Sequence, residues 1–134
     1  MAREKTFVML KPDCIKRGLV GEVISRIERK GWRISDAKTR TLEPGFLYVF
    51  YEHIKEQPYF LEVFNYMLSG TVMGMVVEGD HAVEGMRKLI GSTIFEEALP
   101  GTIRGDFAVS SANSLIHASK NAEHVNIEKD IFFN

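Results

Sequence analysis

Residues 5–31, with the sequence KTFVMLKPDCIKRGLVGEVISRIERKG, contain a short apolar run followed by apolar residues at helical spacing. The run Lys5–Leu10 is short and apolar, and Pro12 follows it without the N–H group that a strand needs to continue. Further on, four apolar residues recur at helical spacing, namely Val20, Val23, Ile24 and Ile27. Gly31 follows as a typical helix terminator. We therefore predict a strand over residues 5–10 and then a helix that ends before Gly31.

Beyond this unit, the apolar pattern alternates between the two-residue repeat of strands and the longer repeat of helices. Strands are expected over residues 32–42, 71–79 and 105–111. Helices are expected from Pro44, over residues 58–70 and over residues 82–91. This order gives two βαβ-like halves, which indicates an α+β class with a ferredoxin-like βαββαβ antiparallel sheet and helices on one face. The length of 134 residues suits a single domain.

The charges nearly cancel, because 17 basic and 18 acidic residues leave a net charge of −1. Without a basic excess the chain has no general attraction for nucleic acid or for an anionic membrane, so neither is an expected partner. The N-terminal stretch MAREKTFVML has too short an apolar run for a signal peptide or a transmembrane helix. The single cysteine, Cys14, fits a reducing compartment and is best explained as a small buried hydrophobic residue. We therefore expect a cytoplasmic protein.

A phosphate site, if there is one, must be built from side chains, because the glycine-rich Walker A and dinucleotide motifs are both absent. Three cationic residues lie at the ends of predicted elements, where binding residues concentrate: Lys11, Arg87 and Arg104. Each of them, taken alone, is more often an ordinary solvated charge. The pattern therefore allows a phosphate site without requiring one.

The stretch SLIHASKN, residues 114–121, places His117 between an aliphatic pair and two small residues, Ala118 and Ser119. A neutral imidazole near pH 7 offers a nitrogen lone pair, and small neighbours leave room for a bulky electrophile. The alternative is a histidine that has no chemical role and whose ring nitrogens are hydrogen-bonded in the core or at an interface. We interpret His53, His81 and His124 in this way. No HxH, HExxH or CxxC spacing occurs, so we expect no metal ion bound by side chains.

Four motifs occur in a fixed order along the chain: TFVMLKPDCIKRGLVGEVI, PYFLEVFNYMLSG, PGTIRGDFAV and LIHAS. In order and spacing they resemble those of nucleoside diphosphate kinases, and the resemblance covers about residues 5–119. It implies a single nucleoside diphosphate kinase domain over residues 1–134. It also implies reversible ping-pong transfer of the terminal phosphoryl group from a nucleoside triphosphate, typically ATP, to a nucleoside diphosphate through a phosphohistidine on His117.

The resemblance also implies roles for other residues. The nucleotide would be bound through its phosphates by four of them, Lys11, Arg87, Thr93 and Arg104, of which Lys11 would also reach the sugar hydroxyls. Tyr51 would pack beside the histidine, and Ser119 would support it while leaving the front of the ring open. Tyr59 would stack on the base, although the family usually has phenylalanine there. The implied cofactor is Mg²⁺, bound mainly by nucleotide oxygens and water, with no metal-ligand residue in the chain.

Two assignments stay open at this point. A carboxylate on a following helix would hold the far ring nitrogen of His117, and the resemblance allows either Glu128 or Asp130; we favour Glu128 for its longer side chain. The family usually has a ribose-contacting asparagine three residues before the histidine, where this chain has Ser114, with Asn113 one place earlier. We expect the shorter hydroxyl to weaken the sugar contact by about 1 kcal/mol without loss of the chemistry.

Four other residues depart from the family pattern, and two of them bear on assembly. Lys120 replaces an acid, and Ser111 replaces an apolar residue beside the base. Ile94 and Phe95 replace a more polar pair in a loop that commonly meets neighbouring subunits, so we expect a homo-oligomer, either a hexamer or a tetramer. Local packing under the loop is the alternative for this pair.

Two other functions are possible. The run RGDFAV superficially resembles an RNA-recognition motif, but Asp106 interrupts it and the second aromatic strand is missing. The other is a catalytically impaired family member that binds nucleotides as a sensor or scaffold.

Overall fold

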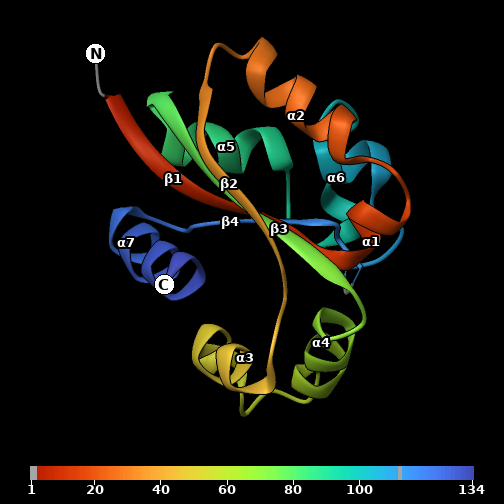
Figure 1. The fold of residues 1–134 in the computed structure, drawn as a ribbon. Coiled ribbons are helices and arrows are strands. Elements are labelled where there is room, and N and C mark those ends of the chain that lie inside the picture. Colours follow the sequence, from red (N-terminus) through yellow and green to blue (C-terminus); the bar gives the residue numbers. More distant parts are fainter. Residues whose placement is uncertain (1–2, 112) are drawn as a thin grey trace.

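The computed structural model describes residues 3–111 and 113–134 and consists of four strands, seven α-helices and two short 3₁₀ helices over this part of the chain (Figure 1). Their bounds are β1 Arg3–Leu10, α1 Pro12–Lys16, α2 Val20–Arg29, β2 Arg33–Thr41, α3 Pro44–Phe50, η1 Glu52–Ile54, α4 Phe60–Met67, β3 Thr71–Asp80, α5 Ala82–Ile90, η2 Phe95–Glu97, α6 Ile103–Phe107, β4 Ile116–Ala118 and α7 Ala122–Phe133. No helix among these residues is both long and apolar enough to cross a bilayer.

The strands form one antiparallel sheet with the order β2-β3-β1-β4. β1 lies inside the sheet and pairs along its whole length with β3, from Arg3 opposite Asp80 to Leu10 opposite Met73. On its other side it pairs with the three residues of β4, which places His117 opposite Met9. The ferredoxin-like α+β fold is therefore confirmed, and the candidate nucleophile lies on a short edge strand.

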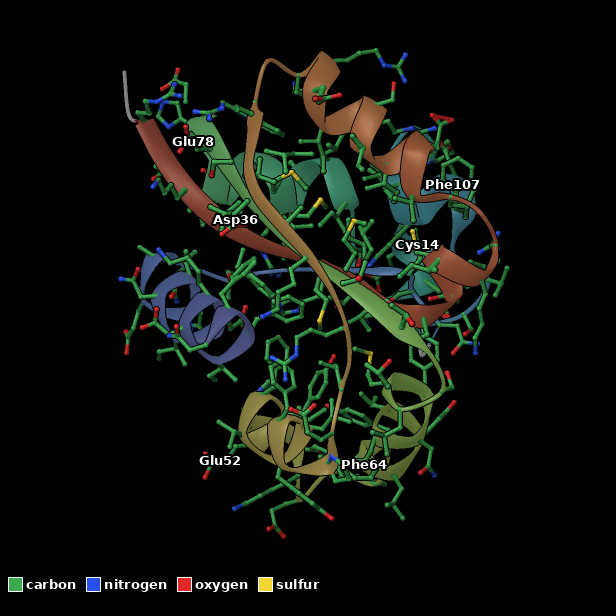
Figure 2. The ribbon with its side chains drawn as sticks, in the orientation of Figure 1. Cys14, Asp36, Glu52, Phe64, Glu78 and Phe107 are labelled. Carbon is green, nitrogen blue, oxygen red and sulfur yellow. The ribbon has the colours of Figure 1, made fainter. Side chains whose placement is uncertain are left out.

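Helices cover both faces of the sheet, so the expectation of helices on one face is wrong (Figure 1). Alternate residues of β1 point to opposite sides: Val8 and Leu10 pack in a core that includes α2 and α5, whereas Phe7 and Met9 pack in a second core with α3, α4 and α7. All four of these side chains are fully buried. A strand that is apolar at consecutive positions needs cover on both faces. In Figure 2, Cys14 and Phe107 lie on the α2 side of the sheet, and Phe64 lies on the opposite side.

The predicted strand over residues 105–111 is also wrong. Residues 103–107 form the helix α6, because the Thr102 hydroxyl accepts a hydrogen bond from the Gly105 N–H at 2.9 Å and caps the first turn. A β-carbon on Gly105 would overlap the Leu99 carbonyl, so this turn requires glycine. Arg104 consequently lies within a helix rather than just before a strand. The fourth strand is β4, and the one-turn helix α1 after Leu10 was not predicted.

Candidate functional site

His117 lies in the middle of β4 with its ring between the second core and solvent. The ring makes an edge-to-face contact with Phe50, with a centroid separation of 5.1 Å, and the Phe7 ring lies 6.4 Å away. The side chain is 23% exposed. Two residues earlier, Leu115 has a left-handed backbone with a φ of 57°, which turns the chain into the strand. The imidazole is thus held by aromatic packing and still reaches solvent.

The far nitrogen of the ring is held by Glu128. The distance from His117 Nε2 to Glu128 Oε1 is 2.8 Å, and the Ser119 hydroxyl donates to the same oxygen at 2.7 Å. Glu128 comes from α7, where Asn121 caps the first turn by accepting from the His124 N–H. Asp130, two residues further along the helix, points elsewhere, is exposed and lines a different cavity. Of the two carboxylates left open by the sequence, Glu128 is therefore the one beside His117.

The charges in this pair follow from its surroundings. Burial lowers the pKa of His117, the neighbouring Lys11 and Arg104 charges lower it further, and Glu128 opposes them. Burial tends to raise the pKa of Glu128, but the contacts with His117 and Ser119 outweigh it and leave that pKa below its usual range. The pair is thus a neutral imidazole beside a carboxylate. Because the carboxylate accepts the Nε2 proton, the lone pair is on Nδ1.

A cavity of about 270 Å³ opens at His117, and it collects residues from α5, α6, β4 and α7. Four further residues that the sequence singled out line it, namely Arg87, Thr93, Arg104 and Glu128. The cavity therefore joins a nitrogen nucleophile to two guanidinium groups and a hydroxyl. Such a set of groups is suited to binding a transferable phosphoryl group.

The two arginines are fixed by backbone carbonyls. Arg104 is buried, and its guanidinium donates to the carbonyls of Ile116 at 2.6 Å, Gly91 at 3.2 Å and Ser114 at 3.5 Å. Burial, with the Arg87 charge, lowers the pKa of Arg104 to about 10, so the group stays protonated at neutral pH. Arg87 donates to the Ala118 carbonyl at 3.3 Å.

Lys11 does not line the cavity, but its charge is close enough to lower the pKa of His117. Its Nζ donates to the Ser114 hydroxyl at 3.1 Å. Burial and the Arg104 charge lower its pKa to about 8, against the opposing effect of Asp13. Ser114 is buried, whereas Asn113 is exposed, so of these two residues Ser114 is the one that faces the lysine.

The two tyrosines occupy different environments. Tyr51 is buried next to Phe50, and its hydroxyl has no hydrogen-bond partner within the described part of the chain. Burial raises its pKa, as does the Glu128 charge. Tyr59, just before α4, is 48% exposed and does not line the cavity.

Three cavity-lining residues, His53, Lys120 and His124, had no site role in the sequence interpretation. The His53 ring lies 6.3 Å from that of Tyr51. His124 precedes Glu128 by one helical turn, a spacing that could have indicated its position. Lys120 stands three residues after His117, and only its departure from the family pattern drew attention to it.

No group of three or more histidine, cysteine, aspartate or glutamate side chains within residues 3–111 and 113–134 is arranged to hold a metal ion. The carboxylate in the cavity, Glu128, already accepts hydrogen bonds from His117 and Ser119.

Comparison with known proteins gives one consistent result. The family model described as nucleoside diphosphate kinase matches residues 4–134. The chain is 52% identical to a nucleoside diphosphate kinase of Ignicoccus hospitalis over 130 residues, 97% of this chain and 88% of the relative. It is 45% identical to that of Saccharolobus solfataricus over 133 residues, 99% of this chain and 96% of the relative.

Solved structures agree with this result. The apo enzyme of Encephalitozoon cuniculi superposes with a TM-score of 0.95 at 40% identity, covering 97% of this chain and 88% of that one. A halophilic nucleoside diphosphate kinase from Halobacterium salinarum in complex with CDP has a TM-score of 0.95 at 35% identity, covering 99% and 89%.

Proposed function

The chain belongs to the nucleoside diphosphate kinase family, and we propose that His117 is the residue through which it transfers phosphoryl groups. The protein is a phosphotransferase that acts on nucleoside tri- and diphosphates. The observation that carries the role of His117 is its geometry: Nε2 is held by Glu128, which leaves the Nδ1 lone pair available at a cavity lined by Arg87 and Arg104.

In the first half-reaction, the Nδ1 lone pair attacks the terminal phosphorus of a nucleoside triphosphate. A P–N bond forms, the bond from phosphorus to the bridging oxygen breaks, and the nucleoside diphosphate leaves with that electron pair. The ring then carries a positive charge, which the Glu128 carboxylate stabilises through the Nε2 proton. A second nucleoside diphosphate enters the same site and takes the phosphoryl group by the reverse steps, so the kinetics are ping-pong.

The phosphate oxygens are bound by side chains around the cavity. Arg87 and Arg104 keep N–H groups beyond those used by the carbonyls, and Thr93 offers a hydroxyl. Lys11 adds charge from behind Ser114 and reaches the sugar and the phosphates when the nucleotide is bound. These groups stabilise the charge that spreads over the equatorial oxygens during transfer.

Mg²⁺ is the proposed cofactor. Because Glu128 is already bonded to His117 and Ser119, the oxygens that bind the ion would be mainly those of the nucleotide phosphates and water. When bound, the ion would neutralise part of the phosphate charge.

The base is contacted less specifically than the phosphates. We propose that it stacks on the exposed face of Tyr59, which provides no edge-specific hydrogen bonds. The Halobacterium salinarum relative was solved with CDP, a pyrimidine nucleotide, which supports a diphosphate ligand. Broad tolerance of the base follows.

We also propose that residues 1–134 form one domain, since both cores pack on the same sheet. A homo-oligomer, either a hexamer or a tetramer, is supported by the exposure of Ile94 at 46%, Phe95 at 36% and Leu99 at 70%. A cytoplasmic location is supported by the free and buried thiol of Cys14.

The role of His117 is tested by incubating the protein with ATP labelled on its terminal phosphate. The wild-type chain should retain label that is stable to alkali and labile to acid, and His117→Ala should retain none. His53→Ala is the matched control, because His53 lines the same cavity from an exposed position and should still be labelled. Label that persists in His117→Ala would contradict the assignment, and an unlabelled wild type would favour a nucleotide-binding scaffold.

A further inference from the structure

The mechanism above leaves one cation of the cavity without a task. We propose that Lys120 binds the terminal phosphoryl group of the nucleoside triphosphate and thereby makes the unphosphorylated site selective for triphosphates over diphosphates. This inference rests on the proposed function of the cavity, which it extends to a residue outside the motifs that carry the family resemblance.

Lys120 is well placed at the edge of the site. It lies between β4 and α7, and the residues on both sides are anchored: the Ser119 N–H donates to the Phe7 carbonyl at 3.0 Å, and Asn121 caps α7. Lys120 lines the His117 cavity and also a neighbouring cavity of about 760 Å³, and it shares both linings with Arg87. It therefore stands at the boundary between the two, with a long side chain that can reach either.

The ammonium group of Lys120 has donors to spare. Arg104 uses its guanidinium on three carbonyls, and Arg87 uses one N–H on the Ala118 carbonyl. Lys120 is exposed, and its side chain has neither a hydrogen bond nor an ion pair to any residue in the described ranges 3–111 and 113–134. All three of its N–H groups are therefore available to a ligand at no cost in protein contacts.

The position of the reacting group explains the selectivity. The terminal phosphoryl group must lie against the free Nδ1 of His117, and Lys120 lines the same cavity as this ring. A terminal phosphate has a second pKa near 6, so this group carries close to two negative charges at neutral pH. A diphosphate bound to the unphosphorylated enzyme has no group at this position. The acid usual in the family would repel a terminal phosphate here, whereas lysine attracts it.

The test compares Lys120→Gln and Lys120→Arg in two assays. One is the affinity for ATP and for ADP, measured by calorimetry in a His117→Ala background, where no transfer can occur. The other is kcat/KM for ATP in the phosphorylation half-reaction of the otherwise wild-type enzyme. Lys88→Gln is the control: Lys88 is exposed, pairs with Glu84 at 3.4 Å, and lines the neighbouring cavity but not the His117 cavity.

We expect Lys120→Gln to weaken ATP binding and to lower kcat/KM by about tenfold each, the effect of one charge-assisted hydrogen bond. ADP affinity should change by less than about twofold, because the phosphate that Lys120 contacts is missing from ADP. Lys120→Arg should retain wild-type values, and Lys88→Gln should leave both assays unchanged.

Two results would overturn the proposal. Equal weakening of ATP binding and ADP binding would mean that Lys120 acts only through the long-range effect of its charge. An unchanged ATP affinity would mean that Lys120 does not contact the nucleotide. A wild-type chain that takes no phosphoryl group from ATP would instead contradict the proposed function, while the binding comparison in the His117→Ala background would still decide the role of Lys120. Thermal unfolding of each variant should match the wild type, since the side chain is exposed.

Discussion

Replacing Glu128 with glutamine tests the His117–Glu128 pair most directly. In the wild type, Glu128 Oε1 lies 2.8 Å from His117 Nε2 and 2.7 Å from the Ser119 hydroxyl. Glutamine keeps the length of the side chain and an oxygen that can accept hydrogen bonds from both groups. It removes the negative charge that balances the ring once Nδ1 is bonded to phosphorus. The variant therefore isolates the electrostatic part of the interaction from its geometry.

The size of the effect follows from the kind of hydrogen bond that is lost. A bond to a charged group contributes about 1.5–3 kcal/mol and one between neutral groups about 0.5–1.5 kcal/mol, so the difference is about 1.5 kcal/mol. That corresponds to a decrease of about tenfold in kcat. KM should stay within about twofold, because Glu128 makes its main contribution after bond formation begins. Rapid-quench measurement of the phosphorylation half-reaction gives both quantities.

The pH profile supplies a second readout with a defined sign. Only neutral His117 can attack, so kcat/KM for ATP falls as pH drops through the pKa of the ring. Burial lowers this pKa and Glu128 raises it, so removing the carboxylate charge lowers it further. The acidic limb of Glu128→Gln should therefore lie at lower pH than that of the wild type.

Asp130→Asn is the matched control on the same helix, since Asp130 is exposed and lines another cavity. It should leave the rate and the acidic limb unchanged. An acidic limb that stays in place or moves to higher pH in Glu128→Gln would contradict this role of the Glu128 charge, as would an equal loss of rate in Asp130→Asn.

Three further predictions concern binding and stability. Affinity for ADP should fall above pH about 8, as Lys11 loses its proton, and this limb should be absent in Lys11→Gln; isothermal titration over pH 7–10 measures it. Gly74→Ala should lower the free energy of unfolding, measured by urea denaturation, by about 1–3 kcal/mol, because the new methyl group would overlap the Phe132 ring. Gly21→Ala lies in a helix with open space around it and should raise the same free energy by up to about 1 kcal/mol. Arg104→Lys should lower the free energy of unfolding by about 2–3 kcal/mol, because one ammonium group cannot replace the bonds of the guanidinium to three carbonyls. An unchanged midpoint of urea denaturation would contradict this prediction.

The elements that the sequence predicted well are those with a strong local period. α2 begins at Val20 and α4 ends at Met67, within the ranges expected from their apolar stripes. β2 lies within the predicted residues 32–42, but a bulge between Ile34 and Asp36 breaks its two-residue alternation, so that Ile34 packs in the first core and Leu42 in the second. α6 was missed because a single hydrogen bond from Gly105 to the Thr102 hydroxyl decides it, and the apolar residues around it do not repeat at helical spacing.

Several residues that line the cavity could be singled out from the sequence, but their arrangement in space could not. His117, Arg87 and Arg104 could be singled out from their types and their family-like spacing, and they line one cavity. The choice between Glu128 and Asp130 depended on the direction of each side chain around α7, and the sequence could not supply that direction without the position of the helix. The packing of helices on both faces of the sheet was also missed, although the uninterrupted apolar run Phe7–Leu10, all of it buried in the structure, indicates it.

The shortness of β4 has a consequence for how heat inactivates the protein. This strand is joined to the sheet along one side only, by pairing of three residues with β1. Two further bonds hold it, from Arg104 to the Ile116 carbonyl and from Arg87 to the Ala118 carbonyl. Fraying of so small a piece exposes little apolar surface, so it requires less free energy than melting of the whole sheet. We therefore expect turnover to cease, reversibly, several degrees before the calorimetric transition begins.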